Sequence, residues 1–159
     1  MGINQRARVR MTDEEISQFL NGRLTMSMAT IGGDDEIHLV AMWYGFVGGL
    51  IAVETKAKSQ KVVNLRKDPR VTVMVDSGES YDQLKGVQIV GRAEVRDDQE
   101  SMFELGVSIF SRYQAPYTPE LKPMVEQLIH NRVAVVVNPL KVVSWDHTKL
   151  GLPDMSPKA

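Results

Sequence analysis

The sequence predicts a β-rich domain of the α+β class, in which six or seven short antiparallel strands close into a barrel flanked by helices. Short apolar segments recur along the chain, and turn residues such as those at 32–36 and 47–49 separate them. Strands and helices do not alternate regularly, and no Gly-x-Gly-x-x-Gly follows a strand, which argues against a dinucleotide-binding α/β fold. Antiparallel strands of this length usually close into a barrel, because closure removes exposed edges.

The N-terminal part of the domain is expected to hold a short helix and three strands. Residues 12–20 predict the helix, because Thr12 and Glu15 have the spacing of a capping box and the apolar residues after them share one face. The following segments are bounded by glycine-containing turns, which is typical of two successive hairpins in a meander. The strands are expected at residues 24–31, 37–46 and 50–55.

The remaining elements begin with a helix that Ser59 can cap and that Asp68-Pro69 ends. Its inward-facing residues are expected to be Val62, Val63 and Leu65. Further strands are expected at residues 70–76, 87–95, 132–137 and 140–146, the last two joined at Asn138-Pro139, and further helices at 98–113 and from Thr118.

The chain of 159 residues is long enough for one domain with a substantial core. Residues 1–10 are polar and basic and are interpreted as an N-terminal arm. Residues 11–152 are interpreted as a single barrel domain that binds a cofactor, and residues 153–159 as a loose C-terminal tail.

Composition excludes several classes of function. The formal net charge is −1 and the pI is about 6.3, which argues against a nucleic-acid partner. The chain has no cysteine, so disulfides and thiolate catalysis are excluded, and a reducing cytoplasm is the expected location. The first residues lack the apolar core of a signal peptide, and no apolar run approaches the roughly 20 residues of a membrane span.

Positive charge is densest between residues 54 and 70, where a strand is expected to end and a helix to begin. Lys56, Lys58 and Lys61 lie near the start of this helix, and Lys58 and Lys61 share its first turn. Backbone N–H groups and the helix dipole favour anions at such a position, so a phosphate site is one interpretation. The other interpretation is a solvated helix face, and composition alone does not separate the two.

The segment "TKAKSQKVVNLRKDPRVTVMV" resembles the split-β-barrel flavin and deazaflavin oxidoreductases, which include pyridoxamine-phosphate oxidase. The shared features are a lysine in the first helical turn, then Asn-Leu, then Asp-Pro-Arg entering a strand. "LTMSMATIGGDDEIHLVAMWYGF" is similar to the first hairpin of that family, and "SWDHTKLGLP" to a subset of its actinobacterial branch that uses coenzyme F420. The resemblance implies a six- to seven-stranded antiparallel split barrel and a homodimer with the cofactor in the cleft between subunits.

The resemblance also implies which residues meet the cofactor. Lys61 would contact its phosphate, and Ser59 stands where the family often has a basic residue. The strand around Ala41 to Tyr44 would run along the ring, and Tyr81 would border the cofactor. The candidate cofactor-binding residues are Met42, Trp43, Tyr44, Thr55, Lys56, Lys58, Ser59, Lys61 and Tyr81.

The implied function is an F420-dependent oxidoreductase that transfers a hydride from the reduced deazaflavin to a small unsaturated organic substrate. FMN as cofactor, with a pyridoxamine-phosphate-oxidase-like reaction, is the alternative, and a carrier that binds F420 or haem without turnover is a second one. F420 bears a longer anionic tail than FMN, so it needs a longer cationic groove. Lys56 and Lys58 could supply it, with Arg6, Arg8 and Arg10.

No catalytic residue can be assigned from the sequence, and no metal site is expected. The three histidines lack ligand spacing. Ser144, Asp146 and His147 are close in sequence, but the alternation of a strand points His147 away from the other two, so no triad is expected.

Overall fold

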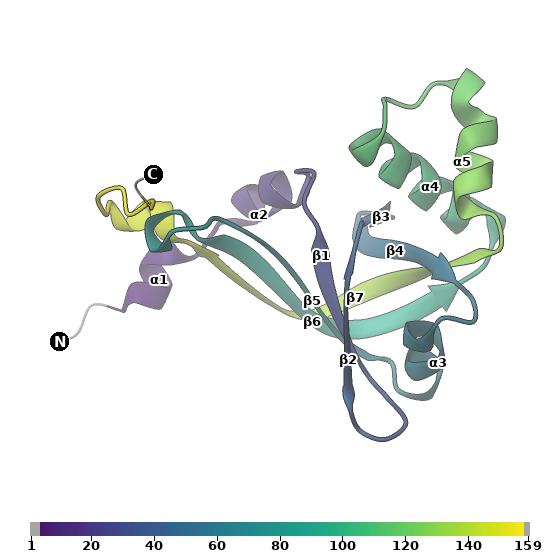
Figure 1. Ribbon diagram of the computed structural model, residues 1–159, viewed down its shortest axis with the longest axis horizontal. Helices are drawn as coiled ribbons and strands as arrows, with labels where there is room; N and C mark the ends of the chain where they lie inside the picture. Colours follow the sequence, from purple (N-terminus) through teal and green to yellow (C-terminus); the bar gives the residue numbers. More distant parts are fainter. Residues whose placement is uncertain (1–3, 158–159) are drawn as a thin grey trace.

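The computed structural model describes residues 4–157 and contains one antiparallel sheet of seven strands (Figure 1). The strand order is β2-β1-β5-β6-β7-β4-β3, and every neighbouring pair is antiparallel. The strands are β1 (Met26–Ile31), β2 (Ile37–Met42), β3 (Gly45–Val47), β4 (Leu50–Lys56), β5 (Arg70–Ser77), β6 (Lys85–Arg96) and β7 (Arg132–Asp146).

The two edge strands of this sheet explain why it curls. β2 and β3 stand at opposite ends of the strand order, yet Trp43 and Tyr44 alone separate them in sequence. The sheet must therefore curl until its two edges meet at this connector. β2 and β3 do not pair with each other, so the barrel remains split along this line. The predicted split barrel of the α+β class is confirmed.

The core fills the inside of the barrel with side chains from alternate strand positions. Met26 and Met28 of β1 and Val73 of β5 are almost fully buried, and Tyr44 of the connector lies among them. A second apolar cluster lies between the sheet and the longest helix, where Leu105 and Ile109 pack against Ala52, Ala134 and Val136.

The helices cover the ends and one side of the barrel. Figure 1 shows α4 (Gln99–Tyr113) and α5 (Lys122–Ile129) beside β3 and β4, and α3 (Gln60–Lys67) at the other end of β4. The opposite end carries both termini, with α1 (Gln5–Val9) beside the 3-10 segments η1 (Tyr81–Gln83) and η3 (His147–Leu150). The remaining helical segments are α2 (Asp13–Leu20) and η2 (Pro119–Leu121).

Two strand predictions need correction. The expected strand at 37–46 is two strands, because the chain leaves one sheet edge at Met42 and joins the other at Gly45. The two strands expected around Asn138-Pro139 are one strand, β7, which passes through the proline with a bulge opposite Val90 and Gly91. A proline is tolerated in a sheet at such a bulge, because the ladder there lacks a hydrogen bond to lose.

The helix starts are largely as expected. The capping box of α2 is confirmed: Thr12 Oγ1 accepts from Glu15 N at 3.2 Å, and Glu15 Oε2 accepts from Thr12 N at 2.7 Å. Ser59 is the N-cap residue of α3, but its side chain makes no capping hydrogen bond. Val63 was expected to face inward and is 40% exposed, because α3 buries only a narrow face on the sheet.

Candidate functional site

The junction of β4 and α3 gathers polar side chains around one lysine. Lys61 Nζ donates to Thr55 Oγ1 at 3.1 Å, and Thr55 Oγ1 lies 3.3 Å from Ser59 Oγ. Burial lowers the pKa of the Lys61 ammonium, with Glu54 opposing this effect and Arg132 adding to it. The ammonium therefore lacks full solvation and would gain from an anion placed beside it.

We call the group formed by Thr55, Ser59 and Lys61 the cradle. Glu54 of β4 and Arg132 of β7 lie beside it, with the Glu54 side chain on the opposite face of β4 from Thr55. Arg132 Nη1 lies 2.9 Å from Glu54 Oε2, and Arg132 stands directly opposite Lys56 in the β4–β7 ladder. The contact between Arg132 Nη1 and Glu54 Oε2 is an ion pair without hydrogen-bond geometry. The buried Glu54 Oε2 has no hydrogen-bond partner among the described residues. Burial raises the pKa of the Glu54 carboxyl, although Arg132 and Lys61 act to lower it.

A basic groove continues from the cradle along the outside of the barrel. It is a hollow of about 750 Å³ between the end of β4 and the turn that precedes β7. Its charged lining is mostly cationic, with Asp97 as the acidic member. The lining includes Lys56, Lys58, His130, Asn131 and Arg132, so two of the sequence-predicted lysines lie here.

The connector between β2 and β3 presents one aromatic ring to solvent. Trp43 is 51% exposed and stacks on Tyr113, with ring centroids 4.6 Å apart and planes 2° from parallel. Tyr113 is fixed from behind, because its hydroxyl donates to Leu24 O at 2.7 Å and accepts from Tyr44 N at 3.3 Å. Trp43 therefore offers a rigid, flat surface beside the split of the barrel.

The other connector residues face the interior. The Tyr44 side chain is fully buried, and its hydroxyl donates to Leu20 O at 2.7 Å. This side chain is part of the core, and its burial raises the pKa of the phenol to about 12. Met42 lies on the inner face of β2 opposite Met26 and is partly buried.

Arg112 of α4 holds the connector between β2 and β3 in place through hydrogen bonds to backbone carbonyl groups. Its Nε donates to Tyr44 O at 3.0 Å, and its Nη2 donates to Leu20 O at 2.9 Å and Gly22 O at 2.5 Å. The guanidinium also lies over the Tyr44 ring, 4.5 Å from its centroid. The sequence analysis did not identify Arg112 or Tyr113, because their contacts cross the fold rather than follow the chain.

Tyr81 lies in η1, at the end of the molecule remote from α3 (Figure 1). Its ring is 49% exposed and meets the edge of His147 at a centroid distance of 4.6 Å. His147 Nδ1 lies 2.8 Å from Tyr81 O. A single chain therefore does not bring Tyr81 together with Lys61.

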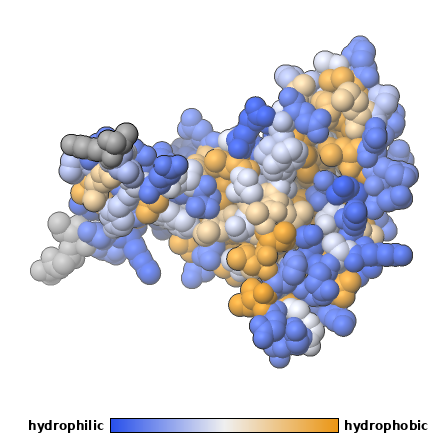
Figure 2. Space-filling view, in the orientation of Figure 1, coloured by the Kyte–Doolittle hydropathy of each residue, from blue (hydrophilic) through white to orange (hydrophobic). Residues whose placement is uncertain are grey.

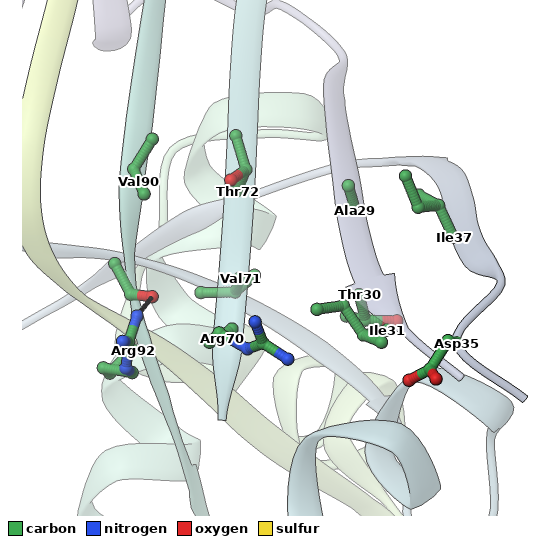
Figure 3. Close-up of a pocket in the computed structure, with 11 residues that line it drawn as sticks. Ala29, Thr30, Ile31, Asp35, Ile37, Arg70, Val71, Thr72, Val90 and Arg92 are labelled. Atoms are coloured by element: carbon green, nitrogen blue, oxygen red, sulfur yellow. Dashed lines mark hydrogen bonds between the residues drawn. The ribbon is translucent and has the colours of Figure 1, made fainter. Parts of the chain in front are cut away.

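The outer face of the sheet carries exposed apolar side chains. Ile37 is 73% exposed and Leu39 67%, both on β2, and apolar surface gathers over the β1–β2 hairpin in Figure 2. A shallow hollow of about 520 Å³ lies on this face. Figure 3 shows Arg70 and Arg92 on one side of the hollow and Asp35 on the other.

Within residues 4–157, no group of three or more His, Cys, Asp or Glu side chains is placed to hold a metal ion. No helix in the same range has the length and apolar character needed to cross a membrane.

The curled sheet with its unpaired edges is the split-β-barrel architecture. The sequence profile of pyridoxamine 5′-phosphate oxidase matches residues 12–146, and the chain belongs to this family. A search of the curated proteins gave no match.

Several solved structures share this fold. A conserved hypothetical protein from Mycobacterium tuberculosis, Rv2991, is 48% identical, with 99% of this chain and 98% of that chain covered and a TM-score of 0.93. An F420 reductase is 23% identical, with coverages of 79% and 94% and a TM-score of 0.57. HutZ, the haem storage protein from Vibrio cholerae, is 15% identical, with coverages of 83% and 94% and a TM-score of 0.64. The two more distant structures share the fold.

Proposed function

We propose that this protein is an F420-dependent oxidoreductase that transfers a hydride from the reduced deazaflavin to a small unsaturated organic substrate. The observation that carries the proposal is the cradle, in which the Lys61 ammonium is partly desolvated at the start of α3. A helix start with a lysine and two hydroxyl groups suits a phosphate.

The residues present fit the anionic part of such a cofactor. The cradle offers Lys61 Nζ and the Thr55 and Ser59 hydroxyl groups, and the basic groove beside it continues the positive charge through Lys56 and Lys58. F420 extends beyond its phosphate with further carboxylates, whereas FMN ends there. The groove therefore favours F420 over FMN as the cofactor.

The ring of the cofactor would lie along the connector, with Trp43 as its flat neighbour. The stack of Trp43 on Tyr113 fixes that surface before binding, so little conformational freedom is lost. We infer no side-chain role for Tyr44, because its ring is buried and its hydroxyl is already bound to Leu20 O.

A second copy of the chain would complete the site. Tyr81 belongs to η1, which packs with η3 at the end of the molecule that carries both termini, remote from α3, so its contribution would require another subunit. The exposed apolar outer face of β1 and β2 gives a surface for this association, because Ile37 and Leu39 would leave water there. The proposed unit is a homodimer with the cofactor between the subunits.

The cofactor would supply the hydride chemistry, and the chain would bind, orient and shield it. The cradle fixes one end through charge, and the connector fixes the plane of the ring, so a substrate with an electron-poor double bond would be held against one face. Positioning of this kind can provide much of the rate without a dedicated acid–base pair.

Titration of the purified protein with F420 and with FMN, followed by fluorescence, tests the proposal. We expect tighter binding of F420, weakened by rising salt because the groove acts through exposed charges. Lys61→Ala removes one charge-assisted contact and should weaken F420 binding about 10- to 100-fold. Lys67→Ala, in the last turn of the same helix, is the matched control and should leave affinity unchanged.

Turnover then separates an enzyme from a carrier. Reduced F420 with an artificial quinone should be oxidised faster in the presence of the protein. Tighter binding of FMN than F420 would favour the FMN-dependent alternative. Tight F420 binding with no turnover of any acceptor would favour the carrier. Equal F420 affinity of Lys61→Ala and the wild type would show that the cradle does not bind the cofactor.

A further inference from the structure

A buried amide joins α3 to the inside of the barrel. Asn64 lies in the middle of α3 and is 1% exposed, and its Nδ2 donates to Thr30 Oγ1 of β1 at 3.1 Å. Thr30 is also 1% exposed. Asn64 Oδ1 accepts from Gln60 Nε2 at 2.8 Å, so a chain of side chains runs from β1 to the first residue of α3.

This contact differs in kind from the other buried contacts of α3. The remaining buried residues of the helix are Val62 and Leu65, which belong to the barrel core. Apolar packing has little directional preference, whereas a hydrogen bond restricts both distance and angle. A buried amide is unfavourable unless it is hydrogen-bonded, and an apolar side chain of similar size would fill the same space without that penalty. The amide therefore contributes to the orientation of the helix more than to burial.

The orientation of α3 decides whether the cradle is assembled. Thr55 belongs to β4 and Lys61 to the first turn of α3, so the 3.1 Å contact between Thr55 Oγ1 and Lys61 Nζ joins two elements. Lys61 and Asn64 are three residues apart and are neighbours on the helix surface. A rotation of α3 that broke the bond from Asn64 to Thr30 would therefore move Lys61 as well. Ser59 does not fix the start of the helix, because its side chain makes no capping hydrogen bond.

We propose that Asn64 is a positioning residue, whose hydrogen bond to Thr30 holds α3 in the orientation that places Lys61 beside Thr55. The inference rests on the proposed function for the anion that the cradle binds, and it goes further by naming a residue that supports the cradle without contacting that anion. A hollow of about 530 Å³ lies beside this network, between α3 and the turn at residues 32–36, and Asn64 lines it. Both polar atoms of Asn64 already have partners within the chain, so the amide is engaged with the protein rather than with a ligand in that hollow.

Removal of both partners of the hydrogen bond tests the inference without leaving a buried polar group unpaired. Thr30→Val combined with Asn64→Leu fills the space with apolar groups, so the chain should still fold. The first readout is the pKa of Lys61, measured by NMR of its side chain through a pH titration, with Lys61→Ala to identify the signal by its loss. Burial lowers this pKa in the wild type, and in the double variant the displaced ammonium should become more exposed, so its pKa should rise toward the ordinary value.

Affinity for F420 is the second readout. We expect the double variant to bind F420 about tenfold more weakly, because a displaced ammonium loses one charge-assisted hydrogen bond. In a Lys61→Ala background the same two substitutions should cause no further loss, because Asn64 acts through Lys61. Thr30→Ser keeps the hydroxyl group and should match the wild type in both readouts. Val62→Ala is the control for stability: it opens a cavity under the same helix but keeps the hydrogen bond, so both readouts should stay unchanged.

The outcomes separate this inference from the proposed function. A raised pKa of Lys61 in the double variant, with no binding of F420 by the wild type, would remove the proposed function and keep the inference. An unchanged pKa of Lys61, an equal rise in Val62→Ala, or an affinity loss that persists in the Lys61→Ala background would overturn the inference. Thr30→Val alone removes the acceptor and decides the matter by the same two readouts if the double variant does not fold.

Discussion

Replacement of Arg112 should loosen the closure of the barrel. The guanidinium donates to three carbonyl oxygens, those of Tyr44, Leu20 and Gly22, and so ties α4 to the connector and to the loop after α2. Hydrogen bonds from a charged donor contribute about 1.5–3 kcal/mol each, but the three share one side chain and are partly exposed. We therefore expect Arg112→Met to lose about 3 kcal/mol, which corresponds to a fall in Tm of about 6–12 °C for a chain of this size.

Thermal unfolding followed by circular dichroism measures this loss. Arg112→Lys keeps the charge but cannot span three carbonyls, so it should lose most of the same stability. Arg66→Met, on the exposed side of α3, is the control and should unfold within about 1 °C of the wild type. The emission of Trp43 should shift in Arg112→Met, because the connector carries its ring. A Tm within about 2 °C of the wild type would refute the anchoring role.

Three further outcomes follow from particular contacts. Gly86→Ala would place a Cβ against the Trp145 ring, so we expect about 1–3 kcal/mol of destabilisation by chemical denaturation and a shift in tryptophan emission. Burial raises the pKa of Tyr44 from 10 to about 12, so between these pH values the folded state keeps the phenolic proton that the unfolded state has lost. The free energy of unfolding should therefore fall by about 1.4 kcal/mol per pH unit from pH 10 to pH 12. Tyr44→Phe should flatten this decline. Leu39→Glu places a charge on the exposed outer face and should turn the proposed dimer into a monomer in sedimentation velocity, whereas a wild type that sediments as a monomer would contradict the dimer.

Features set by neighbouring residues could be predicted from the sequence. The capping box at Thr12 and Glu15 and the end of α3 before Pro69 depend on groups within a few residues of one another. The break between β2 and β3 was not predicted, because residues 37–46 are mostly apolar and Gly45 is the one turn-forming residue among them. The chain leaves one edge of the sheet at Met42 and joins the other edge at Gly45, because the curled sheet brings its two edges together.

The same distinction holds for the site. Thr55, Ser59 and Lys61 are close in sequence, at the end of β4 and the start of α3, so a local sequence pattern was enough to group them. Arg132 reaches Glu54 through the β4–β7 ladder, and Arg112 reaches the connector from α4. Such partners are fixed by strand register and helix packing, which a single sequence does not reveal.

The separation of the cradle from Tyr81 has a thermodynamic consequence for the proposed dimer. If one subunit supplies Lys61 and the other supplies Tyr81, cofactor binding and subunit association share one free-energy cycle. The factor by which the dimer tightens cofactor binding must then equal the factor by which the cofactor tightens the dimer. A change on the apolar outer face, remote from the cradle, would therefore weaken cofactor affinity, and a change at Lys61 would weaken association only when cofactor is present. This asymmetry separates a site shared by two chains from a site that each chain completes alone.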